Sequence, residues 1–377
     1  MDGIINVYKE KGFTSHDVVA KLRGILRQKK IGHTGTLDPD AEGVLPVCLG
    51  RATKVCELLT DWDKEYRAVL QLGRTTDTQD GTGTVLRECP VFCVSDSSDF
   101  SDSDVPGFWL TEDEIRDCIG SFVGEQQQIP PMYSALKVNG KKLYELARQG
   151  IEVERKPRTI TISEIRVERM DMERDGTCST CDFDLQGITD RSGTRIRPDQ
   201  LRTLGFPEIT MTVRCSKGTY IRTLCNDIGE KLGCGGCMKD LVRTQVGPFS
   251  LAESRKLSDI ERLRDENRLE EILHPVDAVF GNLDRLVLTP EAERLVRNGN
   301  SLTPETVKKC VRQSHDDIRT LRREKFSEAS YGCSGSCSGD SADKKQIRIY
   351  AGNGEFLAVY GYNEDRNNWR AVKMFLP

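Results

Sequence analysis

Apolar positions along the chain recur with both helical and strand periods. Apolar residues at 18, 19, 22, 25 and 26 follow helical spacing, and residues 14–17 offer capping side chains, which predicts a helix from about residue 14 to residue 27. Polar and apolar positions alternate over residues 66–72, as in a half-buried strand. Further helices are predicted over residues 111–122, 143–149 and 220–232, and further strands over residues 4–8, 158–166 and 208–215. Because the two kinds of element do not alternate strictly, the pattern predicts an α+β fold.

The pattern of predicted elements changes after about residue 275. Thr289 and Pro290 start a helix with proline at its first position, and Gly299 ends it. Short strands are predicted over residues 346–350, 356–362 and 369–374. We therefore expect two domains, residues 1–280 and a small β-rich domain over residues 281–377.

Three segments have the composition of loop insertions. Residues 95–107 are acidic and serine-rich, residues 173–205 are polar, and residues 327–345 are rich in serine, glycine and cysteine. Such segments bury too little apolar surface to fold by themselves, so we expect exposed, partly disordered surface loops.

Composition excludes several classes of protein. The chain has 377 residues, of which 37% are hydrophobic and 30% charged, and no run approaches the roughly 20 apolar residues that span a membrane. The start has no basic segment followed by an apolar one, so we expect a cytoplasmic protein.

Cysteine is frequent, with 14 residues, but scattered. Two CxxC pairs occur, Cys178 with Cys181 and Cys234 with Cys237. Their separation is much longer than in a compact zinc ribbon, so we predict reduced thiols and no metal site.

The net charge of −4 argues against a nucleic-acid partner when it is taken over the whole chain. Locally the picture differs, because residues 21–30 carry five basic residues and no acidic one, whereas acid gathers in residues 95–104. A basic face is therefore compatible with an acidic protein.

The densest segment is residues 29–54, KKIGHTGTLDPDAEGVLPVCLGRATK. Its four glycines and two prolines indicate a shaped loop and not a regular element. Asp38 precedes Pro39, which favours an extended backbone at Asp38. From the residues alone, Asp38 is explained equally well as a turn cap or as a reactive carboxylate.

The run from Gly32 to Lys54, GHTGTLDPxAxGVLPxCxGxATK, resembles the TruB family of tRNA pseudouridine synthases. The resemblance covers residues 3–94, 111–170 and 206–280, with one departure at Glu10, where family members often have proline. It implies the family's mixed, mostly antiparallel central sheet flanked by helices, and a small PUA-like RNA-binding domain at the end. The other matching blocks are GFTS (12–15), KEYR (64–67), GRTTDT (73–78), QIPPMYSALK (128–137) and CSKGTYIR (215–222).

The resemblance also implies an activity, the isomerisation of uridine 55 in the T-loop of tRNA to pseudouridine. Asp38 matches the catalytic aspartate, which attacks either uracil C6 or ribose C1′. Arg222 matches the arginine that keeps this carboxylate ionised, and Tyr66 the tyrosine that stacks on the flipped uracil. No cofactor is implied. Without the resemblance, Arg222 would be interpreted as a member of a surface ion pair, and Tyr66 as a core residue.

The same resemblance implies a substrate site for the T-arm stem-loop. His33 and Tyr220 match residues near the substrate. Two basic clusters are assigned to RNA phosphates, Lys29 and Lys30 in one and Lys137 in the other. The first cluster also contains Lys21, Arg23 and Arg27, and the second contains Lys141 and Lys142.

We expect a monomer that needs no protein partner and binds no membrane. Two alternatives stay open. A related enzyme modifies other RNAs under guide-RNA direction, and a non-catalytic module would only bind or fold tRNA.

Overall fold

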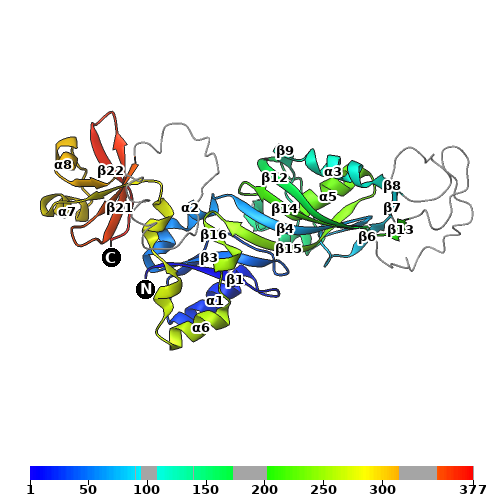
Figure 1. Cartoon of the computed structure of the whole chain (residues 1–377), viewed down its shortest axis with the longest axis horizontal. Coiled ribbons are helices and arrows are strands. Elements are labelled where there is room, and N and C mark those ends of the chain that lie inside the picture. Colours follow the sequence, from blue (N-terminus) through cyan, green and yellow to red (C-terminus); the bar gives the residue numbers. More distant parts are fainter. Residues whose placement is uncertain (90, 95–107, 139, 173–201, 314–345, 377) are drawn as a thin grey trace, which may run out of the picture. The chain divides into compact units, whose positions relative to one another are not determined.

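The computed structural model describes residues 1–89, 91–94, 108–138, 140–172, 202–313 and 346–376 (Figure 1). Two compact units make up the chain. The first contains Met1–Asp38, Val44–Thr60 and Gly247–Pro377, and the second contains Pro39–Gly43 and Asp61–Val246. The proposed domain boundary near residue 280 stays a prediction. Within the described residues, no helix has the length and apolar character needed to cross a membrane.

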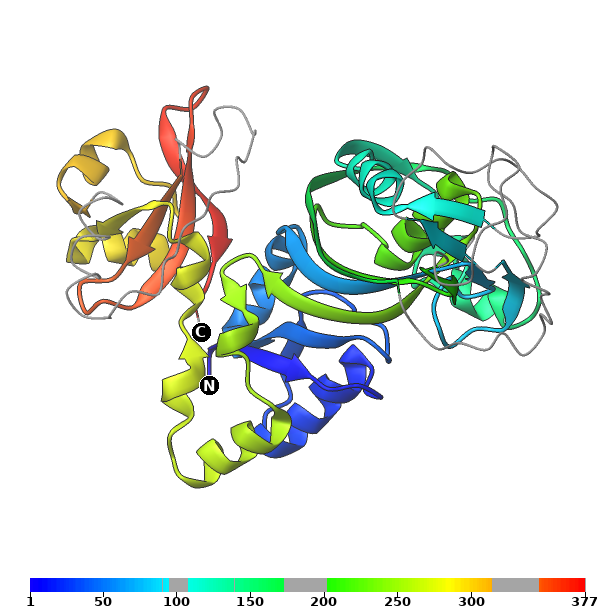
Figure 2. The same cartoon turned by 45° about the vertical axis from the view of Figure 1, so that its right-hand side comes forward.

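The first unit begins with a small sheet packed on two helices. Its strands follow the order β17-β1-β3, and β2 pairs with β3. Helices α1 and α6 lie side by side (Figure 2) and share a core with β1 and β3 that includes Val18, Leu45 and Ile260. The elements are β1 (Gly3–Lys9), α1 (Ser15–Leu26), β2 (Ile31–His33), β3 (Glu42–Leu49), η1 (Gly50–Val55), α2 (Cys56–Thr60), α6 (Leu257–Asp265), β17 (Leu273–His274) and η6 (Val276–Phe280).

The predicted helix after residue 14 is confirmed as α1. Thr14 is its N-cap, and its hydroxyl accepts a hydrogen bond from the Asp17 N–H at 3.1 Å. The Asp17 carboxylate in turn accepts one from the Thr14 N–H at 2.9 Å, which completes a capping box.

The same unit ends in a five-stranded sheet, here called the C-terminal module (residues 284–375). The strand order is β19-β18-β20-β21-β22; β18 and β20 pair in parallel, and the pairs β18–β19, β20–β21 and β21–β22 are antiparallel. Its core includes Leu286, Val296 and Tyr360. The predicted helix and three strands are confirmed, with bounds α7 (Pro290–Arg297), β20 (Gln346–Tyr350), β21 (Phe356–Asn363) and β22 (Asn368–Met374). The other elements are β18 (Asp284–Val287), α8 (Pro304–Lys308) and β19 (Val311–Gln313).

The second unit is an antiparallel sheet in the order β15-β4-β14-β12-β9, with α3 and α5 on one face (Figure 1). The predicted helices and strands are confirmed, although the one at residue 143 is shorter than expected. The main elements are β4 (Lys64–Leu72), α3 (Glu112–Gly120), β9 (Gly124–Gln128), α4 (Leu143–Ala147), β12 (Arg158–Asp171), β14 (Glu208–Cys215), α5 (Ile221–Leu232) and β15 (Gly236–Val246). Smaller sheets contain β5 (Arg74–Thr76) with β6 (Val85–Glu88), β10 (Lys137–Val138) with β11 (Lys141–Lys142), and β13 (Arg202–Gly205) with β7 (Val91–Val94) and β8 (Phe108–Thr111).

Two expectations were wrong. Residues 29–54 are not one irregular loop, because residues 43–50 are buried and form most of strand β3 with the start of η1. The segment 173–205 is not loop to its end, since Arg202–Gly205 is strand β13, paired with β7. The rest of that segment and the other two predicted insertions lie outside the described residues.

Gly43 allows β3 to start where it does. Its φ is +106°, and Glu42 and Gly43 pair in parallel with Val242 and Arg243 of β15. A Cβ at Gly43 would lie 2.2 Å from the Arg243 carbonyl oxygen. The close backbone approach therefore requires glycine.

Gly43→Ala should lower the free energy of unfolding by about 2–4 kcal/mol, from backbone strain and steric overlap. Gly24→Ala in α1 is the matched control, because a Cβ there meets nothing within 4 Å. That variant should be more stable by about 0.5–1 kcal/mol. Urea unfolding of both variants measures the difference, and equal effects would contradict the assigned role of Gly43.

Candidate active site

Asp38 lies in the loop between β2 and β3. These strands pair in an antiparallel hairpin that sets Ile31 opposite Leu49 and His33 opposite Val47. The Leu37 N–H donates a hydrogen bond to the Ser15 Oγ at 3.0 Å, and Ser15 is buried at the start of α1. Asp38 itself is half-buried. The residue directly before the carboxylate is thus fixed to a helix, which limits the movement of Asp38.

His33 shapes the same loop. Its Nδ1 lies 3.0 Å from the Gly35 carbonyl oxygen, and its ring meets the edge of His16 with centroids 5.1 Å apart. Thr34 adds a buried contact, since its hydroxyl donates to the Pro46 carbonyl at 3.1 Å. The loop is therefore held from several sides and is not an open turn.

Arg222 stands in the first turn of α5 and is only 6% exposed. Its guanidinium donates hydrogen bonds to the Tyr133 carbonyl at 2.8 Å, the Thr78 carbonyl at 3.2 Å and the Asp80 carboxylate at 3.3 Å. A buried cation needs such partners, because its desolvation is otherwise costly. The contacts hold the guanidinium in one orientation and join three segments that are far apart in sequence.

Tyr220 directly precedes α5 and is clamped by Gln128, a buried residue at the end of β9. The Gln128 Oε1 accepts a hydrogen bond from the Tyr220 N–H at 2.8 Å, and the Gln128 Nε2 donates to the Tyr220 carbonyl at 3.0 Å. Tyr220 is the N-cap of α5 but supplies no capping side chain. Gln128 therefore takes over the task of satisfying a backbone group at the helix start.

Tyr66 lies on β4 and is 9% exposed. Alternation along the strand places it on the same face as Lys64, Ala68 and Leu70, which are also buried. Helix α5 packs against this strand within the second unit. Burial, with the charge of Arg243 close by, lowers the pKa of Lys64 to about 8.

The basic clusters divide into exposed and structural members. Lys29 and Lys30 have exposed side chains. Arg23 instead donates to the Lys29 carbonyl at 3.2 Å and the Ile31 carbonyl at 3.3 Å, so it braces the segment that precedes the loop. Lys21 lies over the Phe13 ring, 4.3 Å from its centroid.

Lys137 belongs to the hairpin of β10 and β11. It is exposed and pairs directly opposite Lys142, while Val138 pairs with Lys141. Like charges directly opposite each other on paired strands repel, so an anion near this hairpin would relieve the repulsion.

The predicted site residues fall in both units. His33, Asp38, Lys29 and Lys30 belong to the first unit, and Tyr66, Lys137, Tyr220 and Arg222 to the second. The sequence interpretation missed Asp80 and Gln128, although Gln128 opens one matching block and Asp80 lies two residues after the end of another. The described residues contain no group of three or more His, Cys, Asp or Glu side chains suited to a metal ion. Cys178 and Cys181 lie outside them.

Two family models match the chain. The TruB family pseudouridylate synthase (N terminal domain) matches residues 23–196, and the tRNA pseudouridylate synthase B C-terminal domain matches residues 222–280. The chain is 46% identical to tRNA pseudouridine synthase B of Lachnoclostridium phytofermentans over 100% of both chains. It is 41% identical to the protein of that name from Alkaliphilus oremlandii, over 80% of this chain and 83% of the relative.

Solved structures add a likeness of fold. One is a Cbf5-Nop10-Gar1 complex, with a TM-score of 0.60 and 23% identity, and another is an H/ACA RNP bound to a substrate RNA containing 2′-deoxyuridine, with a TM-score of 0.58 and 22% identity. Both matches cover 100% of this chain and 85% of the other. They share the α+β architecture with this chain.

Gln128→Leu should destabilise the start of α5. The Tyr220 N–H would lose its partner in a poorly hydrated place, which costs about 1–3 kcal/mol. Gln127→Leu is the matched control, because Gln127 is exposed and its side chain donates to the exposed Thr159 hydroxyl at 2.8 Å. Its effect should stay within about 0.5 kcal/mol. Thermal unfolding distinguishes the two, and equal losses would contradict the clamp.

Proposed function

We propose that uridine 55 in the T-loop of tRNA is the target of this chain. The chain belongs to the TruB family of pseudouridine synthases and is an isomerase that acts on tRNA. The observation that supports this most is the setting of Asp38. Its carboxylate follows a residue tied to α1, in a segment that the family model matches. Four relatives that are 41–46% identical to this chain, over 79–100% of its length, carry the same tRNA-synthase name.

In the proposed reaction Asp38 is the nucleophile. The bond between ribose C1′ and uracil N1 breaks, the detached base rotates, and a bond from C1′ to C5 forms. The proton on C5 leaves to solvent, and N1 takes up a proton, so the reaction is an isomerisation without electron transfer. A carboxylate suits this role because it can add to an electrophilic carbon and leave again. The attacked atom is either uracil C6 or ribose C1′.

Arg222 is proposed to keep the Asp38 carboxylate ionised and oriented. A guanidinium has five N–H donors in a planar fork. The hydrogen bonds of Arg222 to Thr78, Asp80 and Tyr133 use Nη1 and Nη2 and fix the plane of the guanidinium. Asp80 offsets part of the charge of the buried cation. A positively charged group with a fixed direction supports a nucleophile that must stay charged.

Substrate binding is proposed to depend on base extrusion. Taking a stacked uridine out of a folded loop costs a few kcal/mol. Tyr66 would stack on the extruded base, with Tyr220 and His33 lining the pocket. The exposed Lys29, Lys30 and Lys137 would bind phosphates of the T-arm, and binding of a phosphate would relieve the repulsion between Lys137 and Lys142.

The chain is further proposed to act as a cytoplasmic monomer without a protein partner. The solved structures of similar fold are complexes with other proteins or RNA. Their identity to this chain, 22–23%, supports the fold only. The higher identity to bacterial relatives named for tRNA favours direct recognition of tRNA over guide-RNA direction.

The experiment incubates the purified full chain with an unmodified tRNA transcript in EDTA, without added cofactor, and maps pseudouridine at nucleotide resolution. The matched control is the same transcript with cytidine in place of uridine 55. We expect pseudouridine at position 55 of the first RNA and none in the second. Modification at other positions would contradict the substrate, and tight binding without any product would indicate a non-catalytic tRNA-binding protein.

A further inference from the structure

Strands β2 and β3 form a hairpin, here called the catalytic hairpin, whose turn carries Asp38. Arg51 in η1 lies directly after β3, at the other end of this hairpin from Asp38. The Gly50 N–H donates to the Lys30 carbonyl at 2.8 Å, so η1 is tied to the residue that precedes β2. The segment that carries Arg51 is therefore joined by backbone hydrogen bonds to the hairpin whose turn carries Asp38.

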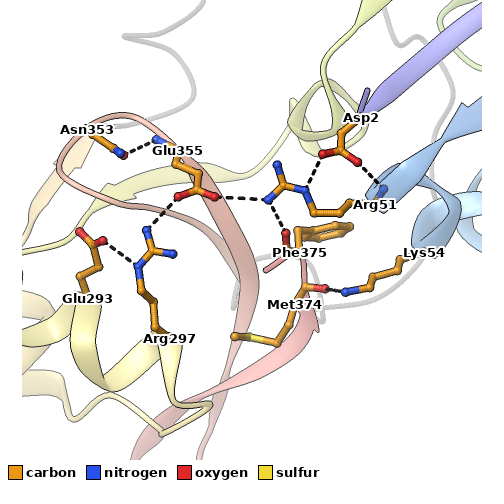
Figure 3. A network of polar contacts seen from close by, with 9 residues as sticks. All are labelled: Asp2, Arg51, Lys54, Glu293, Arg297, Asn353, Glu355, Met374 and Phe375. Atoms are coloured by element: carbon orange, nitrogen blue, oxygen red, sulfur yellow. Dashed lines mark hydrogen bonds and ion pairs between the residues drawn. The ribbon is translucent and has the colours of Figure 1, made fainter. Parts of the chain in front are cut away.

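Asp2 fixes Arg51 on its own side of the network. The Asp2 carboxylate accepts hydrogen bonds from the Arg51 backbone N–H at 2.6 Å and from its Nε at 2.8 Å (Figure 3). Gly50 makes this possible, because its φ is +57° and a Cβ there would lie 2.1 Å from an Asp2 carboxylate oxygen. The guanidinium is thereby aimed in one direction.

The Arg51 guanidinium points toward the C-terminal module. The Arg51 Nη1 donates to the Phe375 carbonyl at 2.9 Å and pairs with the Glu355 carboxylate at 3.3 Å (Figure 3). The neighbouring Lys54 Nζ donates to the Met374 carbonyl at 3.1 Å. Two cations of η1 thus hold the end of β22 by its backbone, which depends little on the side chains of β22.

Glu355 is shared with a second arginine. Its other oxygen accepts from Arg297 Nη2 at 2.8 Å, and the Arg297 Nε bonds Glu293 at 2.9 Å. The hydrogen bond from Arg297 contributes most, and that from Arg51 less, to holding the pKa of Glu355 below its usual value. Arg297 and Glu293 both belong to the module, so this half of the network orders the module internally. Only the Arg51 half of the drawn network joins Glu355 to η1.

An apolar cluster supports the polar contact. Phe375 is 2% exposed and stacks on Phe356, with ring centroids 5.0 Å apart. Phe280 at the end of η6 lies 6.0 Å from Phe356 and 5.9 Å from Phe375. An apolar centre with a polar rim is the usual composition of a specific interface.

We propose that Arg51 is a positioning residue, which holds the C-terminal module against the catalytic hairpin so that both bind one tRNA as a single body. The inference rests on the proposed function for its kinetic test. The module presents exposed cations suited to phosphates, namely Lys308, Lys309, Arg366 and Arg370. Phosphates bound there strengthen the binding of a tRNA held at the loop of Asp38 only if the module keeps a fixed position relative to that loop.

The kinetic test compares Arg51→Ala with Arg297→Ala in the full chain. Both variants remove one ion pair of Glu355, but only the first breaks the contact with η1. With full-length tRNA, Arg51→Ala should raise KM about fivefold or more and leave kcat within about twofold. Arg297→Ala should leave both parameters within about twofold, and Arg51→Lys should recover part of the lost KM. A fall in kcat at unchanged KM, or equal effects of the two alanine variants, would overturn the proposal.

Hydrogen exchange gives a test that does not depend on activity. In Arg51→Ala, amides in both Gly50–Val55 and Asn368–Met374 should exchange faster than in the wild type. In Arg297→Ala, faster exchange should be confined to Pro290–Arg297 and its neighbours in the module. If amides in Gly50–Val55 and Asn368–Met374 exchanged as slowly in Arg51→Ala as in the wild type, the proposal would be overturned. This outcome does not depend on whether the wild type modifies tRNA. The proposed function fails separately, when the wild type forms no pseudouridine.

Discussion

A buried guanidinium has to be surrounded by acceptors, and the second unit satisfies this requirement at Arg222. Its partners come from the Thr78–Asp80 turn and from Tyr133, while Gln128 fixes the backbone immediately before the same helix. The strands of the sheet bring these segments together. Three of the blocks that resemble the family therefore meet at one cation: residues 73–78 supply Thr78, residues 128–137 supply Tyr133, and residues 215–222 supply Arg222 itself.

The loop of Asp38 depends on a different kind of support. It closes a hairpin whose backbone is tied to α1 at Leu37, and the hairpin continues into η1, where Arg51 contacts the C-terminal module. The two units thus use different contacts: a backbone N–H bonded to the Ser15 hydroxyl steadies the loop of Asp38, whereas two backbone carbonyls and the Asp80 carboxylate hold Arg222. The proposed chemistry at Asp38 would require this positional accuracy.

Local rules predicted the elements with strong caps and clear periods. The capping side chains of residues 14–17 located α1, and alternation of polar and apolar residues located β4. Glycine and proline in residues 29–54 obscured β3, because this eight-residue strand, with seven buried positions, contains a glycine and a proline and lies among residues typical of a loop. Asp80 and Gln128 were missed because their partners are 142 and 92 residues away along the chain. Only the folded sheet makes those contacts visible.

We propose that Asp38 attacks the uridine, and loss of the hydrogen on uracil C5 reports the reaction directly. With tRNA tritiated at C5 of its uridines, the wild type should release a single tritium per molecule to water. Asp38→Asn should bind the RNA and release none. Asp40→Asn, an exposed neighbour in the same loop, should release tritium at the wild-type rate. Release of tritium by Asp38→Asn at the wild-type rate would contradict the assignment of Asp38 as the nucleophile.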